Sequence, residues 1–205
     1  PAAQTSAGTP DFLLEQGERL FDGFQYDLAM PILDRLVVVL TTDGQPQRPE
    51  LLVSAYELRA RSRFALGDAA GTDADFASLL SVNPGFRLTQ EISPRVVEIL
   101  ETVRARTIGQ VRLSVTPPGD VLVDGRPLAA TPDAQLIELV AGEHQITAAR
   151  VGYRPVTQTV TVVAGNAETL NVVLERISAT LSITSVPAEV DVVFDGKPPK
   201  TDDDD

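Results

Sequence analysis

The sequence VRLSVTPPGDVLVDG at residues 111–125 opens the stretch that decides the fold, and VTQTVTVVAGNAETLNVVL at residues 156–174 closes it. Within this stretch apolar and polar side chains alternate in short runs, and Pro-Gly, Asp-Gly and Gly-Asn pairs separate the runs. Such alternation is typical of strands with one buried face, and the separating pairs favour tight turns. The pattern predicts about six or seven short strands over residues 110–176, arranged as two small antiparallel sheets packed face to face.

Turn residues predict how some of these strands pair. Asp124-Gly125 is a strong hairpin signal. The strands on either side of Ala164–Asn166 are predicted to pair with each other.

His144 is in phase with the apolar residues that follow it, so we interpret it as a sheet position near a strand start rather than a metal ligand. Residues 108–110 are interpreted as a short hinge before the first strand.

Five features follow one another in this stretch: the turn Pro117–Asp120 before Val123-Asp124-Gly125, then Thr131-Pro132, then Leu139 with Gly142-x-His144, then Gly152-Tyr153, and last the alternating strands that close it. In order and spacing they resemble a PEGA domain. One departure is Ala129-Ala130, where the family usually has a Gly before Thr-Pro. The resemblance implies a β-sandwich module of bacterial and archaeal envelope or surface-layer proteins, without known catalysis.

A second copy of the module begins soon after the first. LSVT at residues 113–116 recurs as LSIT at residues 181–184, and VDG recurs as FDG. Residues 178–205 are therefore interpreted as a partial second module with an acidic tail. Either the rest of that module is cut away or unseen, or strands of a neighbouring subunit complete it. The apolar residues that would need such a partner are Leu181, Ile183, Val190, Val192 and Phe194.

The N-terminal half shows the period of helices rather than strands. Residues 1–9 are expected to be a flexible lead-in, and residues 10–107 a helical domain. Apolar stripes predict two helical hairpins followed by one closing helix, with Ser93 and Pro94 starting the last one. This is the outline of a short solenoid, and a plain helical bundle is the alternative.

Small and apolar residues of both hairpins recur at fixed spacings, namely Gly17, Leu20, Ala29, Leu33 and Leu36, then Ala60, Gly67, Phe76, Leu79 and Pro84. They resemble the tetratricopeptide repeat, with Thr41, Thr72 and a long connecting loop as departures from its pattern. The resemblance implies a concave surface that grips an extended or helical peptide. Its residues would be Leu14, Glu18, Phe21, Glu57, Arg61 and Phe64. The alternative for Phe21 and Phe64 is a place in the core.

Composition excludes several classes of function. The net charge of −12 argues against nucleic acid and against anionic membranes as partners. The absence of Cys excludes thiolate catalysis and Cys-ligated zinc, and a lone His excludes His-based triads and two-His metal sites. Lysine occurs at Lys197 and Lys200, so a core lysine nucleophile is missing. Arg59, Arg61 and Arg63 are interpreted as a solvated helix face.

The remaining signals concern location and role. No apolar run approaches the roughly 18 residues that span a bilayer. The chain begins Pro-Ala-Ala-Gln without Met, and both removal of a signal peptide and simple trimming of the chain would explain this start.

We expect a non-enzymatic bacterial protein outside the cytoplasm (periplasm, cell surface or extracellular), without cofactor or metal. We expect it to assemble into an envelope-associated or filamentous homopolymer. A peptide-binding envelope adaptor is the alternative, and a carboxylate-dependent hydrolase is the third hypothesis.

Overall fold

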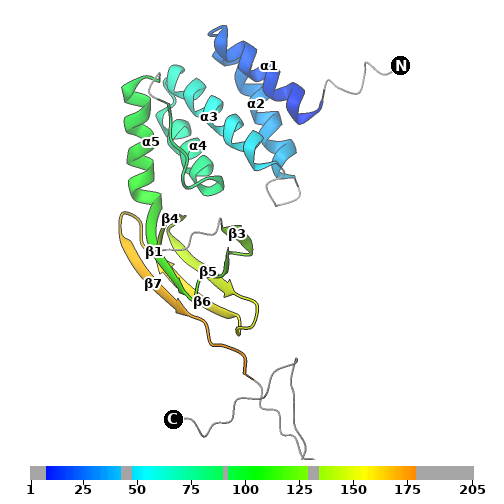
Figure 1. Cartoon of the computed structure of the whole chain (residues 1–205). Coiled ribbons are helices and arrows are strands. Elements are labelled where there is room, and N and C mark those ends of the chain that lie inside the picture. The colour runs from blue at the N-terminus through cyan, green and yellow to red at the C-terminus, as the bar shows by residue number, and fades with distance from the viewer. Residues whose placement is uncertain (1–7, 43–47, 90–91, 129–133, 179–205) are drawn as a thin grey trace, which may run out of the picture. The chain divides into compact units, whose positions relative to one another are not determined.

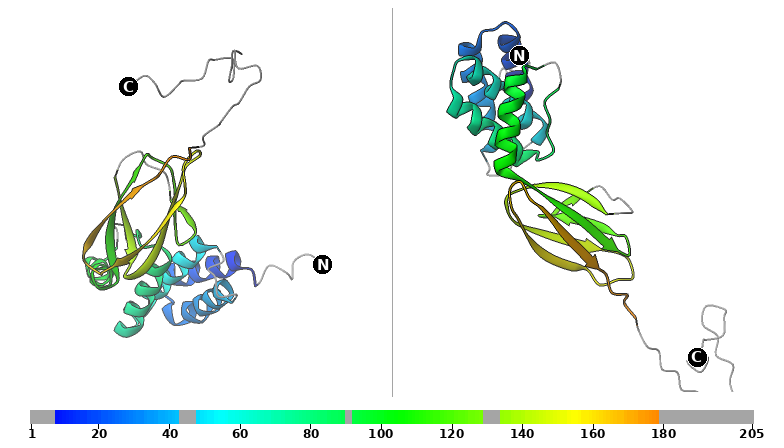
Figure 2. Two further views of the ribbon diagram at one scale, coloured as in Figure 1. Left: turned by 90° about the horizontal axis from the view of Figure 1, so that it is seen from below. Right: turned by 90° about the vertical axis from the view of Figure 1, so that its left-hand side faces the viewer.

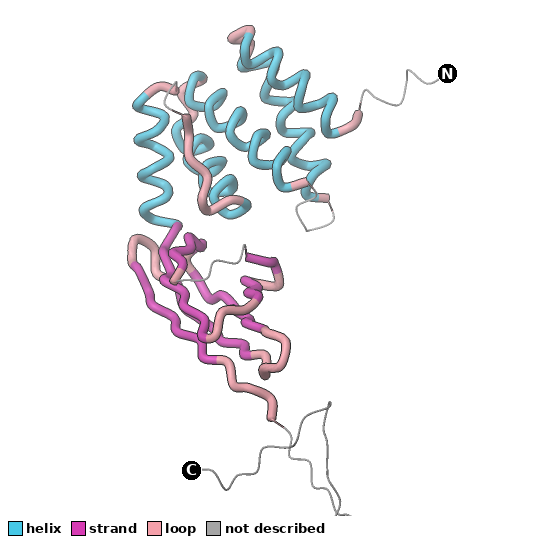
Figure 3. Tube along the Cα trace, viewed as in Figure 1, coloured by secondary structure: helices cyan, strands magenta, loops and turns pink. Residues whose placement is uncertain are grey.

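A computed structural model describes residues 8–42, 48–89, 92–128 and 134–178 of the chain. The helices lie in the N-terminal part and the strands follow from residue 108 on, as Figure 3 shows. The described residues up to Glu175 belong to one compact unit. The predicted strand residues of the second module, from Leu181 to Phe194, lie outside the described residues.

Five helices form in the described N-terminal part, as the apolar periodicity predicts (Figure 1). Thr9 accepts a hydrogen bond from the Phe12 N–H and caps the first helix, and proline begins the third and fifth helices. Gly67 follows the third helix with φ +80°, the left-handed conformation that favours glycine after a helix end. The helices are α1 Pro10–Asp22, α2 Tyr26–Thr41, α3 Pro49–Ala65, α4 Ala69–Val82 and α5 Pro94–Thr107.

Each helix packs on the next one in the chain, and α1 also contacts α3. Small residues allow this close packing. Gly17 is buried, and a Cβ built on it would lie 2.7 Å from Leu33 Cδ2. Thr72 is buried in the contact between α3 and α4, where its hydroxyl donates to the Asp68 carbonyl at 2.7 Å. The hydroxyl is thus satisfied although the contact excludes water.

Seven strands follow in the described part of the chain and form two sheets. The strands, coloured green to orange in Figure 2, make up one sheet of the order β4-β1-β7 and a second sheet of the order β3-β2-β5-β6. Apolar side chains of both sheets meet in one buried cluster, which includes Val111, Ile146 and Val172. The strands are β1 Ile108–Thr116, β2 Asp120–Val123, β3 Arg126–Leu128, β4 Gln135–Val140, β5 Gly142–Ala149, β6 Val156–Val162 and β7 Ala167–Val173.

The predicted pairing across Ala164–Asn166 is wrong. The strand before this turn, β6, pairs with β5, and the strand after it, β7, pairs with β1 in parallel. The turn therefore carries the chain from one sheet to the other. The Gly165 N–H donates to the Ile108 carbonyl at 2.9 Å, and the Gln110 N–H donates to the Asn166 carbonyl at 2.8 Å. These bonds align the start of β7 with β1, so the β4-β1-β7 sheet is mixed rather than antiparallel.

The predicted hinge at residues 108–110 is also absent. Helix α5 ends at Thr107 and β1 begins at Ile108. Ile108 is buried in the same apolar cluster as residues of α3, α4 and α5. Gly109 is buried as well, and a Cβ built on it would lie 2.4 Å from the Val163 carbonyl oxygen. Burial of these residues makes the connection between helix and strand part of the packed structure.

Candidate protein-binding surface

Helices α1 and α3 carry the six residues predicted to line a groove. Three of them follow one another at helical spacing on α1, and the other three do so on α3. Residues at this spacing share one face of a helix. Because α1 contacts α3 directly, the two faces are neighbours in the structure.

Three of the six residues are brought into direct contact. The Arg61 guanidinium lies 4.6 Å from the centroid of the Phe21 ring, a cation–π contact between α3 and α1. Glu57 Oε1 accepts a hydrogen bond from Arg61 Nη1 at 3.0 Å. The Glu57 carboxylate thus holds the guanidinium against the aromatic ring.

The other three residues have different surroundings. Leu14 packs against the apolar cluster that includes Leu13 and Leu36. Phe64 packs, partly buried, against the cluster formed by α3, α4 and α5. Glu18 is exposed. Phe21 and Phe64 are therefore not equivalent in this structure, because Phe21 contacts a charged side chain whereas Phe64 packs against apolar residues.

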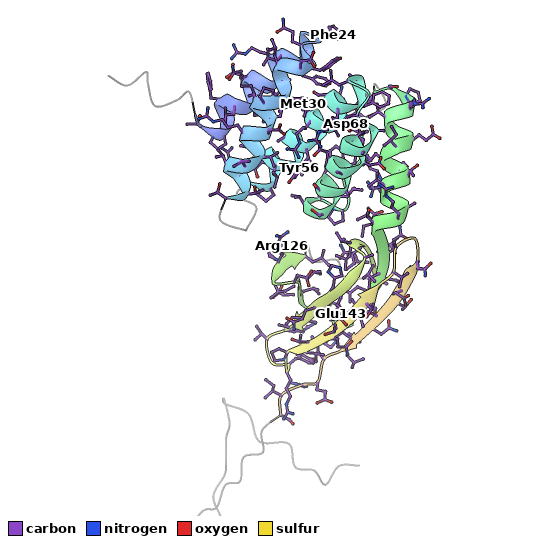
Figure 4. All side chains as sticks on the ribbon, turned by 180° about the vertical axis from the view of Figure 1, so that it is seen from behind. Phe24, Met30, Tyr56, Asp68, Arg126 and Glu143 are labelled. Carbon is purple, nitrogen blue, oxygen red and sulfur yellow. The ribbon has the colours of Figure 1, made fainter. Side chains whose placement is uncertain are left out.

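Two further aromatic residues extend this surface and were missed by the sequence reasoning. The ring centroid of Tyr26 lies 5.4 Å from that of Phe21 and 6.3 Å from that of Phe24, both edge to face. Phe24 is 79% exposed and lies in the turn between α1 and α2, where Figure 4 labels it. The signal was present in the sequence as three aromatic residues in the six positions 21–26.

Arg59 and Arg63 do not form the predicted solvated face. Arg59 Nε donates to both carboxylate oxygens of Asp75 at 3.0 Å, and its Nη1 donates to Asp34 Oδ1 at 2.9 Å. Arg63 Nη1 lies 3.1 Å from Asp75 Oδ2. The Asp75 side chain is 2% exposed, so these arginines neutralise a buried carboxylate. Burial lowers the pKa of Arg59, but the bonds to Asp75 and Asp34 outweigh it and the pKa is raised.

A second polar cluster joins the helices to the sheets. The Arg104 guanidinium is largely buried, donates to the carbonyls of Pro84 and Phe86, and lies 3.6 Å from Glu138 Oε2 on β4. Arg87 Nη2 donates to the other oxygen of Glu138 at 2.7 Å. Partial burial raises the pKa of Glu138, but the bond from Arg87 and the two positive charges outweigh it, so the pKa lies below its ordinary value of 4.5.

His144 lies near the start of β5, as its phase in the sequence predicts. Its Nδ1 is 2.7 Å from Asp124 Oδ2 and its Nε2 is 2.6 Å from the Val140 carbonyl oxygen. A carbonyl oxygen can only accept, so Nε2 donates to Val140, and Nδ1 lies within hydrogen-bond distance of the Asp124 carboxylate. Burial raises the pKa of Asp124, but the bonds from His144 and the Gln145 N–H outweigh it and the pKa is lowered.

A hollow beside these groups has a volume of about 500 Å³ and is lined by residues of β2, β3, β4 and β5 and of the end of α4. Its two carboxylates are Asp124, which contacts the His144 ring, and Glu138, which pairs with Arg87. Among the residues that the structure describes, no group of three or more His, Asp or Glu side chains could hold a metal ion. Within the same residues, no helix is long and apolar enough to cross a membrane.

Comparison with known protein families identifies a domain in the sheet-forming part of the chain. Residues 108–178 match the model of the PEGA domain. The match covers all seven described strands and confirms the resemblance seen in the sequence. PEGA domains are generally found in extracytoplasmic proteins. No tetratricopeptide family is detected in the helical part. A search of curated proteins finds no match to this chain.

Proposed function

We propose that this chain is a non-enzymatic, extracytoplasmic adaptor whose helical part binds a peptide segment of another protein. The observation that carries the proposal is the contact between Arg61 and Phe21, which joins α3 and α1 into one polar and aromatic surface. Aromatic and arginine side chains are enriched where proteins bind one another. The PEGA match supports a role outside the cytoplasm.

The proposal includes a tetratricopeptide-like arrangement of the helices and a β-sandwich for the sheets. Contact of α1 with both α2 and α3 supports the first, since it is the packing of stacked helical hairpins. The close approach of Gly17 to Leu33 supports it too, because both are repeat positions in the sequence. The core shared by the two sheets supports the second. We place the division between the two domains at the end of α5.

The absence of enzymatic activity is part of the same proposal. A carboxylate-dependent hydrolase needs an acid and a base that are free to exchange protons with a substrate. In the hollow between β2, β3 and β4, Asp124 contacts the His144 ring and Glu138 is bound to Arg87. Both carboxylates have lowered pKa values, which is unsuitable for a general acid at neutral pH.

Selection of peptides from a displayed random library against the full chain tests the adaptor function. We expect enriched peptides that lose binding when Phe21→Ala and Phe64→Ala are combined, while circular dichroism shows a helical signal close to that of the wild type. Val151→Ala is the matched control, because Val151 is 99% exposed and lies in the sheet-forming part. Failure to enrich any peptide, or binding that the double variant retains, would refute the adaptor.

A second candidate function is assembly into an envelope-associated or filamentous homopolymer. The favouring observation is the position of β1, which contains LSVT and pairs with β4 on one side and β7 on the other. The repeated sequence LSIT at residues 181–184 is thus a copy of a strand that has a neighbour on each side. Copies of the chain could supply such neighbours by strand addition.

Deletion of residues 178–205 tests the assembly. The wild type is expected to form particles larger than a monomer, and the deletion variant to have monomeric mass by light scattering. All residues of the described sheet core precede residue 178, so the variant is expected to stay folded. A wild type that is monomeric, or an assembly that the deletion leaves unchanged, would contradict this second candidate.

A further inference from the structure

Phe24 lies in a conformation that its residue type disfavours. Its φ is +57°, whereas Gly23 immediately before it has an ordinary φ of −79°. A bulky residue with positive φ is a genuine outlier, because its Cβ crowds the backbone. A chain with phenylalanine at position 23 and glycine at position 24 would not have this strain. The strained residue is also 79% exposed, so its ring gains little from packing.

The exposed ring is one end of a continuous row of side chains. Phe24 contacts Tyr26, Tyr26 contacts Phe21, and the Phe21 ring lies under the Arg61 guanidinium. We call these four residues the aromatic band. It runs from the α1–α2 turn across α1 to α3. Strained, exposed residues cluster at binding sites, where function compensates the local cost.

Acidic residues flank the aromatic band along the chain, since Asp22 follows Phe21, Asp27 follows Tyr26, and Glu18 lies one helical turn before Phe21. Glu18, Asp22 and Asp27 are exposed, and no ion pair is found for them among the residues that the structure describes. Residues 10–41 contain six acidic residues and two arginines. Uncompensated carboxylates attract a basic partner, and the faces of aromatic rings also attract cations. A partner that contacts the rings and these carboxylates together needs both apolar and basic side chains.

We propose that the aromatic band and its acidic flank bind a cationic amphipathic segment of a partner protein. This inference rests on the proposed adaptor function and specifies its partner. The apolar side chains of the segment pack on Phe24 and Tyr26, and its lysine or arginine side chains pair with Glu18, Asp22 and Asp27. Exposed Leu28, in the first turn of α2, adds apolar area near the same turn. The band is the specific part of the site, and the carboxylates add long-range attraction.

Binding of three labelled helical peptides to the full chain tests the proposal by fluorescence anisotropy. One probe combines leucine and lysine in an amphipathic pattern, the second combines leucine and glutamate, and the third combines serine and lysine. The Leu/Lys peptide is expected to bind, more weakly as salt is added. The Leu/Glu peptide is expected not to bind, and the Ser/Lys peptide to bind at least about tenfold more weakly.

Phe24→Asn separates binding from packing, because asparagine tolerates the left-handed conformation. We expect this variant to lose about tenfold or more in affinity for the Leu/Lys peptide without a fall in melting temperature. Val151→Asn removes an equally exposed apolar side chain elsewhere and is expected to bind as the wild type does. Replacing Asp22 and Asp27 together by Asn is expected to weaken binding and its salt dependence.

Several results would overturn this inference. They are a wild type that does not bind the Leu/Lys peptide, equal binding of the Ser/Lys peptide, unchanged affinity of Phe24→Asn, and a lowered melting temperature of that variant. These results can be distinguished from a failure of the proposed adaptor function. Library peptides that depend on Phe21 and Phe64 but carry no basic residues, or bind Phe24→Asn normally, would keep the adaptor and refute the aromatic band as its cationic-peptide site.

Discussion

The helical part and the sheet part of this chain are stabilised by contacts of different range. Consecutive helices pack on one another, and their buried residues form clusters from neighbouring segments. The sheet core instead joins distant segments, and Gln110 at the start of β1 pairs with Ala167 of β7. Contacts between neighbouring segments follow from local periodicity, whereas strand order depends on which distant segments meet.

The two parts also place their charges differently. The helical part buries Asp75 beneath Arg59 and Arg63, so two helices are joined by ion pairs inside the packing. The sheet part places Asp124, the partner of the His144 ring, at the turn between β2 and β3, where the carboxylate is half exposed. The helical part should therefore be the more sensitive to loss of a charge.

The largest effect is expected for Asp75→Asn. The substitution leaves two largely buried arginines without their shared counter-charge, and breaking a buried pair in this way costs about 3–5 kcal/mol. Urea denaturation followed by the helical circular dichroism signal measures the loss. Asp34→Asn is the control, because Asp34 binds the same Arg59 from a side chain that is 50% exposed, and it should cost about 1 kcal/mol or less.

The Asp75 result also tests how separate the two parts are. If the sheet part is stable without the helices, its NMR signals should persist at urea concentrations that unfold the helices of Asp75→Asn. Simultaneous loss of both sets of signals would show that the two parts unfold as one unit. The two parts would then differ in the range of their contacts but not in their stability.

A smaller loss is expected for Gly109→Ala at the junction between α5 and β1. The new methyl group would lie 2.4 Å from the Val163 carbonyl oxygen, which belongs to the backbone and cannot move freely. Such overpacking costs about 1–3 kcal/mol. Gly17→Ala is the matched change in the helical part, where the methyl would meet the Leu33 side chain and not the backbone. Its effect should be under about 1 kcal/mol, since alanine also favours the helix. Equal losses in urea melts would contradict this reasoning.

A gain in stability is expected for Ser62→Ala. Ser62 is buried in α3, and no hydrogen-bond partner is found for its Oγ within the described residues. Removing an unsatisfied hydroxyl and introducing a better helix former should raise the free energy of unfolding by about 1 kcal/mol. Thermal melts of the variant and the wild type measure the change. A lower melting temperature would mean that the hydroxyl has a partner that stabilises the fold.

The smallest effect concerns Glu138 and pH. Its pKa is lowered in the folded protein, so the stability it contributes is complete above the ordinary value of 4.5 and disappears as pH falls through the folded pKa. Glu138→Gln should remove this part of the acid sensitivity and lower stability at neutral pH, since Arg87 and Arg104 lose their charged partner. Unfolding curves of both proteins at pH 3, 5 and 7 test the sign, and parallel pH profiles would exclude the link.

Much of the fold could be predicted from the sequence, and less of the candidate site. The helices, the strands and the PEGA resemblance were predicted correctly because each rests on a pattern within a few residues. Leu14, Glu18 and Phe21 were assigned to a groove from the resemblance to the tetratricopeptide repeat, and that assignment stays a prediction. Phe24 was missed because an exposed aromatic residue in a turn has no periodic partner. Arg59 and Arg63 were misassigned because their partner Asp75 lies on another helix.

By itself the sequence determined where helices and strands form, because apolar spacing and turn residues act over short distances. Only the tertiary structure decided that β7 lies parallel to β1, that Ile108 belongs to the helical core, and that Asp75 is buried between two arginines. Each of these outcomes is a choice among distant partners. Burial and hydrogen bonding select these partners only when the whole chain folds, so the pairings cannot be predicted from a local sequence pattern.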